Sequence, residues 1–156
     1  MKQLYEITEE DWVMSSPNMP TLATVHVYAG MALIESTSIS EGRGTTKPFQ
    51  LTGYPGINAK ELLKYLRGKV DEKQAYLRET YIIPTFSKHV GEVCGGVDVM
   101  PKSTSQTFYG YNSVETSLYI LQGYLKLNET ITISTGIDKL FGIVGFFTMV
   151  KEKSVE

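Results

Sequence analysis

Two segments with leucines at helical spacing, separated by two strand-like segments, most constrain how this chain can fold. Residues 58–67 and 113–127 each place apolar side chains three and four positions apart, on one face of a helix. Residues 75–83 and 93–100 lie between them and have the pattern of strands. The two apolar faces consist of Ala59, Leu62, Leu63, Leu66 and of Val114, Leu118, Leu121, Leu125. The pattern predicts a mixed α+β fold, with a small sheet and two main amphipathic helices.

Cap and glycine residues indicate where these elements begin, end and approach one another. Asn58 is expected to cap the first helix, with Glu61 three residues later as in a capping box. Gly68 suits the left-handed conformation that ends a helix. Gly95 and Gly96 lie inside the second strand and indicate a bulge or a close approach of another backbone.

Three further segments are less regular. Residues 22–35 are apolar enough to be core, and Gly30 is expected to divide them into two short elements. Residues 49–53 alternate with a period of two, which predicts a short, half-buried strand. Residues 140–150 are an apolar run of about eleven residues, whereas a membrane-spanning helix needs about twenty. A buried strand, a buried helix or a poorly packed tail is therefore expected there, rather than a membrane-touching tail.

Charge and cysteine content exclude several classes of protein. The 156 residues suit one domain, and 15 Lys and Arg against 17 Asp and Glu give a net charge of −2. This balance gives no electrostatic footprint for nucleic acid or an anionic membrane. Cys94 is the single cysteine, which excludes an internal disulfide. Residues 1–11 lack an apolar signal-peptide core and carry acids, so the chain as it stands is expected to be cytoplasmic.

A polar loop at residues 40–48 contains the most suggestive chemistry. Gly42 and Gly44 flank Arg43, and Glu41 precedes them, but the spacing matches neither nucleotide-binding glycine motif. Two readings of the charges stay open. They form a solvated pair of little energetic value, or they present a carboxylate and a guanidinium to a polar ligand such as an acidic sugar.

A metal or cysteine-nucleophile site is not indicated. His89, Glu92 and Cys94 lie close together in sequence, but zinc sites show paired ligands at short spacings. Cys94 stands beside two glycines and has the character of a small buried residue. We therefore expect no metal and no cofactor.

Three stretches of the sequence together resemble a known family. They are WVMSSPNMPT at 12–21, SEGRGTTKPF at 40–49 followed by GYP at 53–55, and PTFSKHVGEVCGGV at 84–97. In this order they resemble the NamZ family of exo-acting β-N-acetylmuramidases. The resemblance covers about residues 12–97 and fades after about residue 105.

The resemblance implies a larger, two-domain protein that releases N-acetylmuramic acid from the non-reducing end of peptidoglycan fragments. An N-terminal Rossmann-like domain carries the proposed catalytic glutamate, a smaller domain packs on it, and the substrate lies between them. Residues 1–19 would be a remnant of the linker or the end of the absent Rossmann-like domain. Residues 20–150 would be the NamZ-like C-terminal domain, and 151–156 a tail. Family members are often exported.

The resemblance also suggests which side chains meet the sugar, while no catalytic residue is assigned in this chain. The expected substrate-binding residues are Asn18, Glu41, Arg43, Thr45, Lys88 and His89. If they bind the sugar, Arg43 and Lys88 should face one cleft; alternatively, Arg43 pairs with Glu41 or Glu35 and only braces the loop. The chain alone is expected not to hydrolyse substrate. A non-catalytic muropeptide-binding or domain-docking module, or a decayed fragment without function, remain the alternatives.

Overall fold

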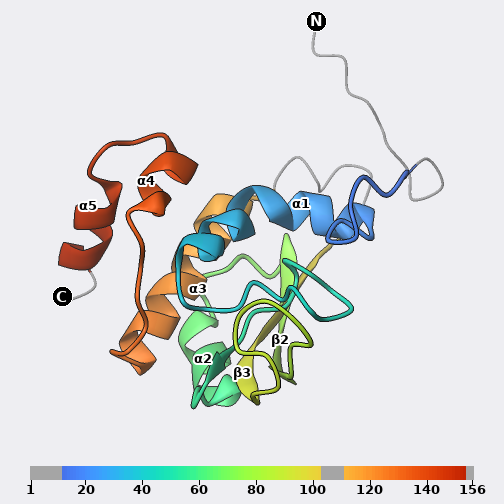
Figure 1. Ribbon diagram of the computed structural model, residues 1–156, viewed down its shortest axis with the longest axis horizontal. Coiled ribbons are helices and arrows are strands. Elements are labelled where there is room, and N and C mark those ends of the chain that lie inside the picture. Colours follow the sequence, from blue (N-terminus) through green and yellow to red (C-terminus); the bar gives the residue numbers. More distant parts are fainter. Residues whose placement is uncertain (1–11, 103–110, 154–156) are drawn as a thin grey trace, which may run out of the picture.

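The computed structural model describes residues 12–102 and 111–153, so residues 1–11 and the last residues of the expected tail lie outside it. The expected α+β fold is confirmed: helices pack against a three-stranded sheet (Figure 1). The helices are α1 (Leu22–Met31), η2 (Ala32–Ser36, a 3-10 helix), α2 (Ala59–Leu66), α3 (Ser113–Leu127), α4 (Gly136–Phe141) and α5 (Phe146–Lys153). The strands are β1 (Tyr54–Pro55), β2 (Ala75–Ile82) and β3 (Cys94–Pro101).

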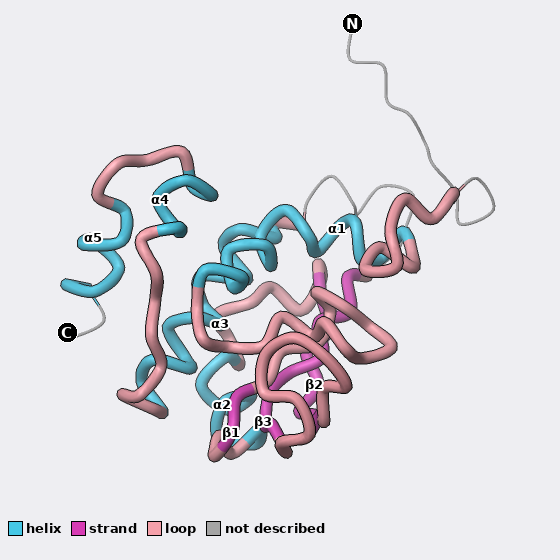
Figure 2. Tube along the Cα trace, in the orientation of Figure 1, coloured by secondary structure: helices cyan, strands magenta, loops and turns pink. Residues whose placement is uncertain are grey.

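The sheet is antiparallel, with β3 in the centre (Figure 2). β2 pairs with β3 along its whole length, from Ala75 opposite Pro101 to Ile82 opposite Cys94. β1 pairs on the other edge of β3, with Tyr54 opposite Gly95. Both predicted strands are therefore confirmed within a residue of their expected ends.

The glycines of β3 allow other backbone segments to approach very closely. A Cβ on Gly96 would lie 1.8 Å from the carbonyl oxygen of Thr52, and one on Gly95 would lie 2.0 Å from that of Ile57. The two strands keep an uninterrupted register here. Of the two expectations for this glycine pair, the close approach is therefore the one that the structure shows.

The predicted half-buried strand at residues 49–53 is wrong as a regular strand. This segment runs beside β3 but makes only isolated bridges, Leu51 with Asp98 and Gly53 with Ser40. Phe49 has a φ of 63°, a left-handed conformation that interrupts extended structure. All five residues are buried, since the segment is enclosed by the core and not placed at its surface.

Both predicted helices are confirmed, and caps explain where they begin. The predicted apolar face of α3 is wrong in part: Leu121 is buried, but Val114 is exposed, and Ile120 and Tyr124 fill the core instead. The Asn58 side chain accepts hydrogen bonds from the backbone N–H groups of Lys60 and Glu61 at the start of α2. Asn112 caps α3 in the same way, accepting from the N–H of Glu115. Gly68 has a φ of 78°, as expected for a residue just beyond a helix.

The apolar segment 22–35 forms two elements, as expected, but the division falls after Met31 and not at Gly30. Gly30 has another role: a Cβ there would lie 1.9 Å from the carbonyl oxygen of Ser113, at the start of α3. The glycine therefore lets α1 and α3 approach closely, and both pack on the core above the sheet (Figure 1).

The apolar run at residues 140–150 is divided between α4 and α5. Asp138 joins them, because its carboxylate accepts hydrogen bonds from the N–H groups of Gly145 and Phe147. The rings of Phe141 and Phe146 stack at 3.7 Å between centroids, and Phe146 is buried in the core. None of the helices among the described residues is long and apolar enough to cross a membrane.

Candidate functional site

The glycine loop at residues 40–48 folds back on itself through its glycines and threonines. Gly42 and Gly44 have φ values of 80° and 81°, which favour glycine. Thr45 closes the turn, because its backbone N–H and its hydroxyl both donate to the carbonyl oxygen of Gly42, at 3.1 and 2.6 Å. The loop is thus a fixed structure rather than a loose connection.

A second loop, residues 83–93 between β2 and β3, is joined to the glycine loop. The N–H and the hydroxyl of Thr85 both donate to the carbonyl oxygen of Gly44, at 3.0 and 2.9 Å. Ser87 and His89 have φ values of 72° and 55°, which cost a non-glycine residue roughly 1–2 kcal/mol each. Lys88 lies between them, so this costly backbone directs the lysine toward the glycine loop.

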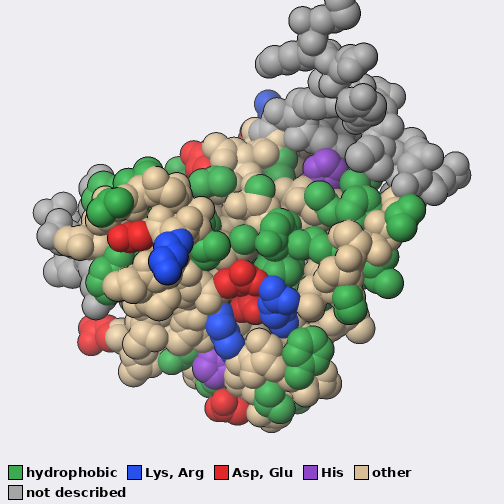
Figure 3. All heavy atoms as spheres, turned by 45° about the horizontal axis from the view of Figure 1, so that its top comes forward, with side chains coloured by type: hydrophobic (Ala, Val, Ile, Leu, Met, Phe, Trp, Pro, Cys, Tyr) green, Lys and Arg blue, Asp and Glu red, His purple; other side chains and the backbone are tan. Residues whose placement is uncertain are grey.

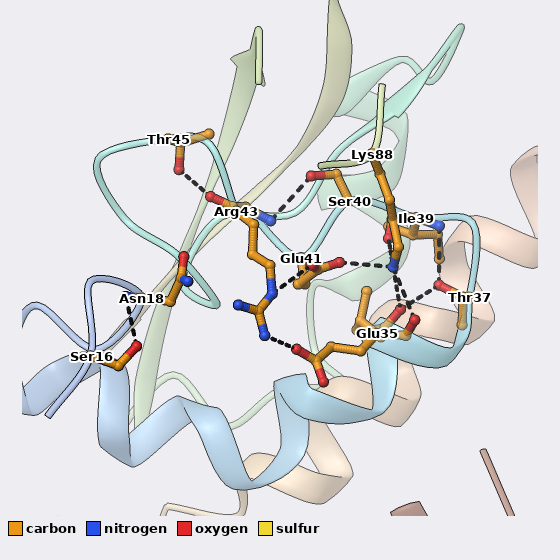
Figure 4. A network of polar contacts seen from close by, with 12 residues as sticks. Ser16, Asn18, Glu35, Thr37, Ile39, Ser40, Glu41, Arg43, Thr45 and Lys88 are labelled. Atoms are coloured by element: carbon orange, nitrogen blue, oxygen red, sulfur yellow. Dashed lines mark hydrogen bonds and ion pairs between the residues drawn. The ribbon is translucent and has the colours of Figure 1, made fainter. Parts of the chain in front are cut away.

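Glu41 is buried where these two loops meet. Its side chain is 3% exposed, and each carboxylate oxygen has a cationic partner (Figure 4). Arg43 Nε lies 3.1 Å from Oε1, and Lys88 Nζ lies 2.8 Å from Oε2. A buried carboxylate is tolerated only with such partners. Arg43 and Lys88 are therefore brought to the same carboxylate, from loops 45 residues apart in sequence.

Lys88 is held by more than Glu41. Its ammonium also lies 3.2 Å from the carbonyl oxygen of Ile34, 3.1 Å from that of Glu35 and 2.9 Å from that of Ile39. An ammonium has three donors, and these four acceptors occupy all of them. A cation at these carbonyls also stabilises the C-terminal end of η2. Lys88 therefore holds the site together and has no free donor for a ligand.

Arg43 is the member of the cluster with donors left over. It pairs with Glu35 through Nη2 and with Glu41 through Nε, and its guanidinium lies 5.0 Å from the ring centre of Phe49. The hydrogen bond to Glu35 is the main reason that the pKa of Arg43 is raised; partial burial acts in the opposite direction. Its side chain is 31% exposed, so its remaining N–H groups can reach a ligand.

We call Glu35, Glu41, Arg43 and Lys88 the loop cluster. Its two acids and two bases cancel in formal charge. Figure 3 shows acidic side chains with basic side chains beside them, and a histidine nearby, on one face of the molecule.

The other expected site residues lie around the cluster rather than in it. His89 Nε2 lies 2.7 Å from the carbonyl oxygen of Ser38, and Nδ1 lies 3.5 Å from Glu92. The backbone N–H of Asn18 donates to Ser16 Oγ, ahead of α1 (Figure 4). Thr45 serves the turn of the loop itself.

Sequence reasoning missed most of what Lys88 contacts. Backbone carbonyls such as those of Ile34 and Ile39 carry no sequence signal, and only the fold brings them to the ammonium. The sequence predicts Glu35 only as an alternative partner of Arg43, in the case that Arg43 braces the loop. That pairing exists, together with the pairing to Glu41.

The structure offers no metal centre among the residues it describes. No group of three or more His, Cys, Asp or Glu side chains there could hold a metal ion. Cys94 is fully buried, and burial, with a smaller contribution from Glu92, raises the pKa of its thiol to about 11.

Comparison with known proteins assigns the family. The model of the family described as "Exo-beta-N-acetylmuramidase NamZ, C-terminal" matches residues 26–156. The chain belongs to this NamZ C-terminal family. The similarity thus extends to the end of the chain, whereas the sequence motifs suggested that it fades after about residue 105.

A curated relative and two solved structures agree with this assignment. Peptidoglycan beta-N-acetylmuramidase NamZ of Bacillus subtilis (strain 168) is 38% identical over 144 residues, which cover 90% of this chain and 34% of the relative. Crystal structures of two DUF1343 family proteins from Bacteroides fragilis NCTC 9343 share the fold. Their TM-scores are 0.62 and 0.60 at 24% and 22% identity, covering 73% and 90% of this chain and 29% and 36% of theirs. The NamZ C-terminal chain therefore spans about a third of the length of these relatives.

Proposed function

We propose that this chain is the C-terminal part of an exo-β-N-acetylmuramidase-like hydrolase and that the loop cluster helps to bind N-acetylmuramic acid. The observation that carries the proposal is Arg43, a partly exposed guanidinium fixed by two carboxylates in a chain of the NamZ C-terminal family. The lactyl carboxylate of muramic acid suits the remaining N–H groups of such a guanidinium.

Within the cluster the residues have different roles. Arg43 is the group that meets the sugar. Glu41 and Lys88 are positioning residues: Glu41 fixes Arg43, and Lys88 fixes Glu41 against η2. His89 is held by Ser38 at the rim of the same region. This division explains why a buried acid is present at a site that binds an acidic ligand.

The chain alone is proposed not to hydrolyse the glycosidic bond. Glycosidases ordinarily need a proton donor and a second carboxylate acting as nucleophile or base. Both carboxylates of the loop cluster are in ion pairs, and Glu41 is buried under its partners. The acid that performs the chemistry would come from a Rossmann-like N-terminal domain, as family members are expected to have.

Binding of the free sugar tests this proposal directly. N-acetylmuramic acid should bind this chain more tightly than N-acetylglucosamine, which lacks the lactyl carboxylate, in a calorimetric titration. Arg43→Gln should remove this preference, while the exposed control Lys64→Gln should keep it. Equal affinity for the two sugars, or an unchanged preference in Arg43→Gln, would contradict the assigned role.

Turnover separates the hydrolase from a binding module. The chain should not cleave a chromogenic N-acetylmuramic acid glycoside, and adding the separately expressed remainder of the Bacillus subtilis relative should produce turnover that Arg43→Gln lowers. Turnover by the chain alone would show that a complete site lies within it. Sugar binding without any turnover in the mixture would favour the non-catalytic muropeptide-binding module.

A docking role is also supported by one feature of the surface. Ile83, Phe86, Val90 and Val93 are each more than half exposed, and all belong to the loop that carries Lys88. Apolar side chains gathered in this way mark a surface that another protein part covers. We propose the Rossmann-like domain as that part. Mixing the chain with that domain should protect the backbone amides of 83–93 from hydrogen exchange.

A further inference from the structure

Apart from the loop cluster, a polar pocket lies between the glycine loop and β2. It has a volume of about 650 Å³ and is open to solvent. It is lined by residues 44–47 of the loop, by Arg78 and residues 80–83, and by Leu51, Thr85, Phe86 and Asp98. No member of the loop cluster lines it. The two sites therefore share a loop but not their charged side chains.

Asp98 gives this pocket an incompletely satisfied carboxylate. The residue is 1% exposed, and Lys47 Nζ and Arg78 Nη2 both lie 3.0 Å from the same oxygen, Oδ2. The other oxygen, Oδ1, is buried and has no hydrogen-bond partner among the described residues. A buried acceptor without a donor is costly, so this atom calls for an N–H or O–H group.

The two cations are available for a second acceptor. The side chains of Lys47 and Arg78 are 40% and 58% exposed, and each uses one donor on Asp98. An ammonium has three donors and a guanidinium five. With Asp98 included, the three side chains carry a net charge of +1, which favours a monoanion. Two neighbouring cations of this kind suit a carboxylate.

Apolar side chains complete the pocket. Tyr81, Ile83 and Phe86 line it and are each more than half exposed. They can cover the apolar part of a small ligand whose polar end lies at Asp98. The pocket thus offers an acceptor, two cations and an apolar wall within one open volume.

We propose that this pocket binds a small carboxylate with an amide N–H beside it, the chemistry of an N-acylated amino acid. The ligand carboxylate accepts hydrogen bonds from Lys47 and Arg78, and the acyl group packs on Phe86. Because Oδ1 is buried in the unliganded protein, the Asp98 carboxylate turns toward the pocket when the amide N–H donates to this oxygen. The same chemistry occurs at the C-terminal residue of a peptide and in an N-acetylated sugar acid, so the experiment includes one probe for each source.

The test is an NMR titration of the isotopically labelled full chain with N-acetylalanine. Backbone amides of residues 44–47 and 78–83 should shift with a saturable dependence on concentration. Propionate lacks the amide, and N-acetylalanine methylamide lacks the carboxylate. Each should therefore bind at least tenfold more weakly than N-acetylalanine, which corresponds to a loss of about 1.4 kcal/mol in binding free energy. No saturable shift, or equal binding of propionate, would overturn the proposal.

Variants locate the binding. Arg78→Gln changes an exposed side chain and should weaken N-acetylalanine binding at least tenfold, whereas Arg67→Gln, at another exposed position, should leave it unchanged. Unchanged binding in Arg78→Gln would overturn the proposed site.

N-acetylmuramic acid is the second probe: binding that depends on Arg78 makes a sugar acid a ligand of this pocket. If only N-acetylalanine binding depends on Arg78, the ligand is of the amino-acid type. Because the Arg43 experiments use a different residue, this proposal and the proposed function can fail separately.

Discussion

Lys88 Nζ lies 2.8 Å from Glu41 Oε2 and bonds at the same time to carbonyl oxygens at the end of η2. One ammonium therefore joins the loop at 83–93, the glycine loop and η2. The position of Arg43 depends on this arrangement, because Arg43 is fixed by the carboxylate that Lys88 holds. A residue expected to contact the sugar is, in the structure, the residue that supports its neighbours.

Removing the charge of Lys88 should be more damaging than an ordinary surface substitution. Lys88→Met leaves Glu41 buried with one cation and removes a donor from three carbonyls, so we expect a loss of about 3–5 kcal/mol in the free energy of unfolding. Glu41→Gln should cost about 1–3 kcal/mol. The double variant should cost less than the sum, as measured by urea denaturation of all four proteins. Strict additivity would contradict a direct pairing of the two residues.

The two glycines Gly44 and Gly56 form a matched pair for testing the glycine loop. Both have positive φ, 81° and 76°, so alanine is strained by roughly 1–2 kcal/mol at either position. A Cβ on Gly44 would also lie 2.5 Å from the carbonyl oxygen of Phe86, whereas one on Gly56 meets nothing within 4 Å. Thermal unfolding should therefore show a larger loss for Gly44→Ala than for Gly56→Ala. Equal losses would mean that the contact between the glycine loop and the loop at 83–93 contributes nothing to stability.

The buried thiol of Cys94 predicts a loss of stability at high pH. Its folded-state pKa is raised from 9.0 to about 11, so the folded protein holds this proton more tightly than the unfolded chain. The contribution of this protonated thiol to the free energy of unfolding is fully present below pH 9.0 and is lost as the pH rises through about 11. Wild type should lose stability across this window relative to Cys94→Ala, which has no such proton. At neutral pH the thiol should also react with a disulfide reagent only after unfolding; fast reaction of the native protein would contradict its burial.

The helices α2 and α3 and the two main strands could be predicted because local patterns determine them. The leucine spacing of α2 and α3, the cap at Asn58 and the strand-like stretches before and after Pro84 all act over a few residues. The segment 49–53 could not be predicted, because its alternating pattern is overridden by tertiary contacts. Phe49 takes a left-handed conformation, and the segment forms only an isolated bridge with β3, at Leu51.

Three residues of the loop cluster could be selected from the sequence, but their contacts could not. Glu41, Arg43 and Lys88 could be selected by the resemblance, and the fold brings them together. That Lys88 is saturated by carbonyls depends on the end of η2, a feature without a sequence signal. Asp98 could not be selected from the sequence, because an acid inside a strand has no motif; its burial and its partners Lys47 and Arg78 appear only in the folded chain.

The hydroxyl of Tyr124 predicts how strongly α3 is joined to the sheet. Tyr124 is fully buried, and its hydroxyl lies 3.0 Å from Thr52 Oγ1 and 3.3 Å from the carbonyl oxygen of Gly95. Burial raises the pKa of this phenol, so it remains a neutral donor up to high pH. The hydroxyl therefore links α3 to β3 and to the segment that follows the glycine loop.

Tyr124→Phe removes this donor and leaves the ring in place. The single O–H that lies between two buried acceptors is lost, so we expect a loss of about 0.5–1.5 kcal/mol in the free energy of unfolding. Tyr76→Phe is the matched control; its ring is more than half exposed, and a change there should stay within about 0.5 kcal/mol. Urea denaturation of the three proteins measures the difference. Because the Tyr124 hydroxyl contacts Thr52, Tyr124→Phe should also speed hydrogen exchange at the backbone N–H of Thr52, which donates to the carbonyl oxygen of Val97. Exchange there that is as slow as in the wild type would show that β3 alone holds this segment.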